Sequence, residues 1–256
     1  ASPPALPSAQ ASEERSLAAL RSALEEAQKA LNKAENREQD QARDELRAQY
    51  AALLAEQRAL IAATAPLVGK PVDRRSRLIA GDLKGRQSKI HTQAEALLAS
   101  KPDLTNSPTF PLAHRRLEGA STQAAEMLGK PDLSQGLLIR QETVARTLEG
   151  LIQALASSSS EDDPFRSPEE SGGEQGGQGG QQSPGLIPSA AEVALLKALQ
   201  QEALNVTRQA SEAQDAALSK LAADDAQRLQ SELPRIADEI VKKIEQESGG
   251  GGGGGG

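Results

Sequence analysis

The chain lacks cysteine and tryptophan, and its 256 residues include only one tyrosine and two phenylalanines. Without cysteine there is no disulfide, no thiolate nucleophile and no cysteine-ligated zinc or iron–sulfur centre. Strands pack through aromatic and β-branched side chains, so a shortage of aromatics argues against β-sheet. The chain also has no apolar run of about 18 residues, the length a transmembrane helix needs.

The residues that are abundant favour helices. Ala, Glu, Lys, Leu and Arg make up about half of the chain, a composition typical of long helices and coiled coils. The net charge of −7 is modest for this length. We therefore predict an all-α protein with a long N-terminal coiled-coil-like helix, a three-helix bundle, a disordered Gly/Gln-rich linker and a C-terminal α-hairpin.

Proline and glycine divide the chain, because proline cannot continue the hydrogen-bond ladder of a helix and Gly/Gln-rich stretches are typical of linkers. The predicted segments are a flexible N-terminus (1–11), a long helical segment (12–68), a three-helix bundle (69–156), a disordered linker (157–188), a helical hairpin (189–247) and a glycine tail (248–256). We expect the bundle helices at 73–99, 110–128 and 133–156.

The linker bears on how the hairpin behaves. A flexible chain of this length spans about 30 Å, enough to let the hairpin bind independently of the bundle. An isolated hairpin of about 55 residues is marginally stable, so we expect it to dock or to self-associate. Asp224 and Asp225 suit the start of its second helix, because acidic residues are favourable at a helix N-terminus.

The long helical segment carries two apolar seams with coiled-coil spacing. The first consists of Leu17, Leu20, Leu24, Ala27, Leu31 and Ala34, and the second of Leu46, Tyr50, Leu53, Gln57, Leu60 and Thr64. Only 12 residues separate Ala34 from Leu46, whereas two heptads need 14. We favour one continuous helix with a phase shift over a hairpin, because no glycine or proline interrupts it. Nothing obvious in the sequence covers the first seam, so its leucines are candidate partner-binding residues.

A basic helix lies in the middle segment, where residues 66–156 carry 13 basic and 9 acidic side chains. Its cations are Arg74, Arg75, Arg77, Lys84, Arg86 and Lys89. They are candidates for binding a polyanion or an anionic surface. No aromatic residues are interleaved for base stacking, so nucleic acid is not expected. The competing interpretation is a solvated helix face.

Motifs for catalysis are missing from the sequence: there is no G-x-S-x-G, no Walker A and no credible dinucleotide-binding loop. His114 and Glu118 have the spacing of a helical metal pair, but one His and one Glu hold a metal poorly, so we interpret them as a surface pair. The acidic run 161–163 lacks the glycine and distal Glu of a calcium loop. We expect no enzyme activity, no cofactor, no metal and no catalytic residue.

Two segments carry a resemblance. They are LIPSAAEVALLKALQQE (186–202) with NVTR (205–208), directly after the Gly/Gln-rich linker, and QETVARTLEGL (141–151) before it. Over about residues 75–245 the chain resembles predicted secreted helical proteins of planctomycete-type bacteria that have no assigned activity. The resemblance implies secretion and a helical architecture divided by a linker. It implies no activity and no functional residues.

The expected function is therefore that of a non-enzymatic scaffold or adaptor. Its coiled-coil-like seams would bind a protein partner or a second copy of the chain. The alternative is a polyanion- or surface-binding module that uses the basic helix 74–89. The chain opens with Ala1 rather than Met, as a mature protein does after signal-peptide removal, so we expect a secreted or periplasmic location, with the cytoplasm as the alternative.

Overall fold

The computed structural model describes residues 6–71, 73–130, 133–157, 186–212 and 216–249, and these form helices joined by short connections, without a strand. The elements are α1 (Leu6–Thr64), the 3₁₀ turn η1 (Ala65–Leu67), α2 (Arg74–Ser100), α3 (Pro102–Asn106), α4 (Phe110–Leu128), α5 (Gln135–Ser157), α6 (Ser189–Glu212) and α7 (Ala216–Gly249). The prediction of an all-α fold is confirmed.

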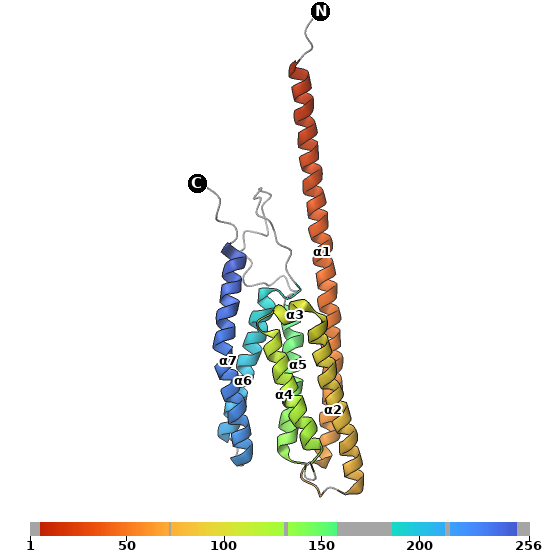
Figure 1. Cartoon of the computed structure of the whole chain (residues 1–256), viewed down its shortest axis with the longest axis vertical. Coiled ribbons are helices and arrows are strands. Elements are labelled where there is room, and N and C mark those ends of the chain that lie inside the picture. The colour runs from red at the N-terminus through yellow and green to blue at the C-terminus, as the bar shows by residue number, and fades with distance from the viewer. Residues whose placement is uncertain (1–5, 72, 131–132, 158–185, 213–215, 250–256) are drawn as a thin grey trace, which may run out of the picture.

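Helix α1 is continuous over 59 residues, a length of about 90 Å at 1.5 Å per residue. The predicted continuous helix is therefore confirmed, although it begins at Leu6 and not at Ser12. Its N-terminal half projects far beyond the other helices (Figure 1). Among the α1 side chains that are described, from Arg15 onward, the first buried one is Arg43. We call the part of α1 before Arg43 the projecting half.

The C-terminal half of α1 is a wall of the helical bundle. Every residue of its second seam, from Leu46 to Thr64, is buried. Helix α1 packs beside α2 and α5, and α4 packs beside the same two helices. The predicted three-helix bundle of 69–156 is thus the larger part of a four-helix bundle, because the apolar faces of α2 and α5 also need the second seam to cover them.

The helices break where glycine and proline were predicted to end them. Gly69 has a φ of 72°, a left-handed conformation that glycine adopts without strain, and its N–H donates to the carbonyl of Leu133 at 3.0 Å. Asp73 caps α2 by accepting a hydrogen bond from the Ser76 N–H at 2.7 Å. The observed bounds of α4 equal the predicted ones, and α2 and α5 are shifted by one or two residues. The five-residue α3 was not predicted.

The C-terminal hairpin packs against the bundle through α6 and α5. Leu186 and Ile187, which lead into α6, are buried in the same apolar core as the four bundle helices. The predicted docking of the hairpin is therefore observed, and its independent binding on a flexible tether is wrong for the described structure. The start of α7 at Ala216 also corrects the predicted start near Asp224 and Asp225. Most of the predicted linker and the tail lie outside the described residues.

A buried polar layer crosses the centre of the four-helix bundle. Gln57 of α1 and Gln87 of α2 exchange hydrogen bonds of 2.9 and 3.4 Å between their side-chain amides. Gln87 also donates to the Ser121 hydroxyl at 2.9 Å, and Gln141 of α5 donates to Thr64 at 3.1 Å. All five side chains are buried. Because each of the four helices contributes, the layer stabilises one relative height of the helices over others.

A second buried polar contact joins α1 to α4. The Tyr50 hydroxyl and His114 Nε2 lie 2.8 Å apart inside the core. The predicted surface pair of His114 with Glu118 is therefore wrong, because the imidazole points inward to Tyr50. Burial raises the pKa of the Tyr50 phenol and lowers the pKa of His114 to about 4.

The low pKa of His114 predicts acid sensitivity. Between pH 6.5, the ordinary pKa of histidine, and about pH 4, the unfolded chain binds a proton that the folded chain does not bind. Stability present above pH 6.5 is thus lost as the pH falls, by about 3 kcal/mol across this window. Urea unfolding at pH 7 and pH 4.5 should show a smaller pH-dependent loss in His114→Gln than in wild type.

The matched control is His91→Gln, which removes the other imidazole, on the partly exposed side of α2. This variant should keep the wild-type pH dependence. The account of His114 would be wrong if His114→Gln lost as much stability on acidification as wild type.

Candidate functional site

The first seam of α1 is an exposed apolar stripe. Its four leucines, Leu17, Leu20, Leu24 and Leu31, are 54%, 67%, 70% and 52% exposed. Ala27 and Ala34, which complete the stripe, are also exposed. Among the side chains that the structure describes, the other exposed large apolar residues are spread over α2, α6 and α7. A contiguous apolar stripe of this kind marks an interaction surface, whereas single exposed apolar residues need no explanation.

The phase shift in α1 turns the first seam away from the bundle core. On an ideal helix, the mean directions of the first and second seams differ by about 70°. The bundle buries the second seam, so the first seam faces another side of the same rod. Figure 1 shows the projecting half standing clear of the other helices. The described part of the structure therefore leaves this stripe open to a partner.

The candidate basic residues of α2 are spread over the whole side of the helix that faces away from the core and are not aligned in one stripe. Arg74, Arg75, Arg77, Lys84 and Lys89 are exposed, while Arg86 is half-buried and its Nε donates to Glu56 of α1 at 2.8 Å. The core face of α2 contains Leu83, Gln87 and Ile90. By helical spacing, Arg74 lies opposite that face, and Arg75 and Arg77 lie toward its two sides. A polymer strand lying along α2 would face only some of these charges.

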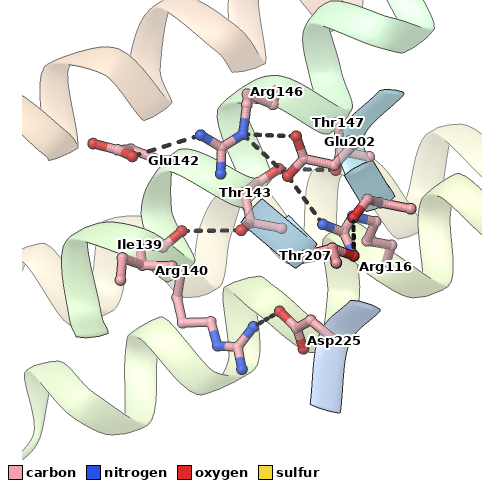
Figure 2. A network of polar contacts seen from close by, with 11 residues as sticks. Arg116, Ile139, Arg140, Glu142, Thr143, Arg146, Thr147, Glu202, Thr207 and Asp225 are labelled. Atoms are coloured by element: carbon pink, nitrogen blue, oxygen red, sulfur yellow. Dashed lines mark hydrogen bonds and ion pairs between the residues drawn. The ribbon is translucent and has the colours of Figure 1, made fainter. Parts of the chain in front are cut away.

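A buried charge cluster holds the hairpin on the bundle. Figure 2 shows the Glu202 carboxylate of α6 between two guanidinium groups, Arg116 of α4 and Arg146 of α5. The closest nitrogen–oxygen distances are 3.1 Å to Arg116 and 3.0 Å to Arg146. The side chains of Arg116 and Glu202 are only 8% and 9% exposed. Burial lowers the pKa of Arg116, and the nearby Glu202 opposes that effect.

A second ion pair ties α7 to the same surface. Arg140 of α5 donates to Asp225 of α7, and both side chains are largely buried. Asp225 thus contributes a tertiary contact instead of the predicted helix start. At the other end of the hairpin, the Lys243 ammonium lies 3.1 Å from the buried carboxylate of Glu192 and joins α7 to α6. Arg140, Asp225 and Glu192 are largely removed from water, so each of these charges depends on its partner.

A cleft of about 190 Å³ lies beside these pairs, between α4, α5 and α7. Four arginines line it, and three of them pair with a carboxylate: Arg115 with Glu232, Arg116 with Glu202 and Arg140 with Asp225. Arg228, the fourth, is exposed. The local charge is therefore largely neutralised within the protein. We interpret the cleft as part of the docking interface and assign it no reaction.

Within the described residues, no group of three His, Asp or Glu side chains is placed to hold a metal ion. The imidazole of His114 is hydrogen-bonded to the Tyr50 hydroxyl in the core. His91 lies 3.9 Å from Glu95, four residues further along α2, a pairing that the sequence analysis overlooked. The acidic run 161–163 lies outside the described residues.

Sequence reasoning missed the polar groups that fix the core and the interface. Gln87 lies four residues after Leu83 and three before Ile90, and Gln141 lies four after Leu137 and three before Val144. Glu202 follows Leu199 and precedes Ala203 on the apolar face of α6. The available signal was a polar residue at a seam position, which indicates a buried partner on a neighbouring helix.

Breaking the Glu202 cluster should destabilise the docked hairpin. Glu202→Gln keeps the shape of the side chain but leaves Arg116 and Arg146 without their shared carboxylate. Removing one partner of a buried ion pair costs about 3 kcal/mol, and urea unfolding at pH 7 measures that loss directly. The matched control is Glu232→Gln at the exposed pair with Arg115, which should cost less than about 1 kcal/mol. Equal losses in both variants would contradict a buried charge cluster.

None of the described helices is long and apolar enough to cross a membrane. Comparison with known proteins adds no further assignment, since no family model, no curated protein and no solved structure matches the chain.

Proposed function

We propose that the protein is a non-enzymatic helical scaffold or adaptor that binds a partner helix through the first seam of α1. The observation that carries this proposal is the exposure by more than half of Leu17, Leu20, Leu24 and Leu31, all on one stripe. Leucine and alanine at alternating steps of three and four are the residues that a coiled-coil partner buries. Activity outside the cytoplasm, which the resemblance to secreted proteins implies, belongs to the same proposal.

The bundle supports this role by anchoring one end of a long rod. An isolated helix in water is marginally stable, because its first turn is costly to form. In α1 the bundle already orders the C-terminal half, where Leu46 and Leu60 are buried. The projecting half extends a helix that is already nucleated. A partner can therefore bind an ordered surface and lose less conformational entropy on binding.

Placing charge on the first seam should abolish pairing without unfolding the protein. In Leu20→Asp/Leu24→Asp, two carboxylates would be buried against an apolar partner surface, which is strongly unfavourable. The measurement is photocrosslinking from an aryl-ketone amino acid at Ala23, beside the seam, together with circular dichroism. The crosslinked product between this chain and its partner should disappear, while the helical circular-dichroism signal stays nearly unchanged.

The matched control is Ser22→Asp/Asn36→Asp, which adds the same charge on the outward side of the helix, where both residues are exposed. This variant should crosslink like the unsubstituted chain. Loss of most of the helical signal in Leu20→Asp/Leu24→Asp would show that the leucines belong to a core. Undiminished crosslinking in that variant would also contradict the proposal.

Binding of an acidic polymer by α2 is the second candidate, favoured by the exposure of Arg74, Arg75, Arg77, Lys84 and Lys89. Displacement of counterions would make such binding depend steeply on salt. If α1 pairing is the function, retention on heparin should end below about 0.15 M salt. It should also be unchanged in Arg74→Ala/Arg75→Ala/Arg77→Ala. Strong retention that this triple variant removes would favour the second candidate.

A further inference from the structure

We infer that the partner on the first seam is a second copy of this chain, with its α1 running antiparallel and a two-fold axis passing between Glu25 and Glu26. This inference rests on the proposed function, because it names the occupant of the same surface. Three features of α1 support it: the order of leucine and alanine along the seam, the charges that flank the seam, and the length of the projecting half.

The apolar residues of the seam match completely in one antiparallel alignment. The spacing places Leu17, Leu24 and Leu31 at heptad position a, and Leu20, Ala27 and Ala34 at position d. In antiparallel pairs, a residues face d residues of the other helix. In this alignment the numbers of two facing residues, one from each copy, add up to 51. The layers are then Leu17 with Ala34, Leu20 with Leu31, and Leu24 with Ala27, and the two-fold axis produces each layer twice.

Neighbouring antiparallel alignments are worse. Shifting one helix by seven residues in one direction places Leu20 opposite Glu38 and Leu17 opposite Gln41, which buries polar groups against leucine. The opposite shift leaves Leu31 without a seam residue facing it. The alignment around Glu25 and Glu26 alone pairs all six apolar positions.

The flanking charges favour the same arrangement. The e positions are Arg21, Gln28 and Glu35. Flanking side chains meet at an offset of five residues from the facing layers, so the e residues that meet have numbers that add up to 56. Arg21 then meets Glu35 of the second copy at two symmetry-related places, and the two Gln28 side chains meet each other. With the same five-residue offset, the g positions bring no like charges together, since Ser16 meets Ala30 and the two Ala23 side chains meet each other.

A parallel pair would lack this complementarity. It would instead place g residues opposite e residues, which pairs Ser16 with Arg21, Ala23 with Gln28 and Ala30 with Glu35. None of these is an opposite-charge pair. Charge complementarity at flanking positions sets orientation in coiled coils, so it selects the antiparallel form.

The length of the projecting half fits the antiparallel pair. It extends from Leu6 to Ala42, so its midpoint is residue 24, within two residues of the proposed axis. Arg43, where the bundle begins, would lie level with residue 8 of the second copy. The two bundles would therefore lie at opposite ends of a shared two-helix rod, and each seam would be covered over its whole length.

Sedimentation equilibrium of the full chain tests whether a second copy binds the first seam. We expect a monomer–dimer equilibrium that Leu20→Asp/Leu24→Asp shifts entirely to monomer and Ser22→Asp/Asn36→Asp leaves unchanged. Arg21→Glu and Glu35→Arg should each weaken the dimer by about five- to tenfold, because each turns two attractive pairs into repulsive ones. Combining the two changes should restore wild-type affinity. Failure of the double variant to recover would overturn the antiparallel assignment.

Cysteine crosslinking tests the orientation, and the natural chain contributes no cysteine of its own. A mixture of Leu17→Cys and Ala34→Cys chains should form the mixed dimer with a short bismaleimide. Ala34→Cys alone should not crosslink to itself, because the two sites would lie about 25 Å apart along the rod. Efficient Ala34→Cys homodimers would overturn the inference in favour of a parallel pair.

The outcomes separate this inference from the proposed function. A chain that stays monomeric at all concentrations, yet photocrosslinks from Ala23 to a different protein, overturns the second copy as occupant and leaves the adaptor function standing. A monomer that forms no crosslink from Ala23 to any protein overturns both.

Discussion

Burial of the second seam of α1 is the contact on which the rest of the structure depends. Helices α2, α4 and α5 present apolar faces that close around a core only when Leu46, Tyr50 and Leu60 form the fourth side. The same contact fixes the direction in which α1 leaves the bundle. Because the two seams are 12 residues apart rather than 14, the helix that satisfies the core exposes the first seam on a different side.

Buried polar groups then specify how the helices align. Apolar packing alone tolerates several relative heights of neighbouring helices, since leucine and alanine fill many similar arrangements. The amide nitrogens of Gln57, Gln87 and Gln141, and the contact between Tyr50 and His114, make their hydrogen bonds at one relative height of the helices. The ion pairs of Glu202 with Arg116 and Arg146 likewise favour one position of the hairpin on the bundle. Slippage would leave these groups buried without partners, which costs more than the bonds themselves contribute.

The sequence was most informative where the heptad spacing of apolar residues and the positions of glycine and proline indicate the same helix. The bounds of α4, the continuity of α1 and the burial of its second seam all follow from heptad spacing together with glycine and proline. The same pattern identified Leu17 to Leu31 as a stripe with no evident cover, and these leucines are exposed in the structure. What that stripe binds stays a prediction.

Long-range pairing could not be predicted in the same way. Nothing local shows that Glu202 meets Arg116, which lies 86 residues away, or that His114 turns toward Tyr50. The composition of the linker suggested an independent hairpin, yet charges and buried leucines dock it. Local patterns determine which face of a helix is apolar, whereas the choice of partner depends on contacts between distant segments.

Amide hydrogen exchange at several protein concentrations tests the division of α1 most directly. The account predicts strong protection of residues 46–64 at every concentration, because the bundle covers them, and protection of residues 15–37 that increases as the protein is concentrated. Protection of residues 15–37 that is strong and independent of concentration would contradict a pairing surface that only a second copy covers. Rapid exchange across residues 46–64 would contradict the four-helix bundle itself.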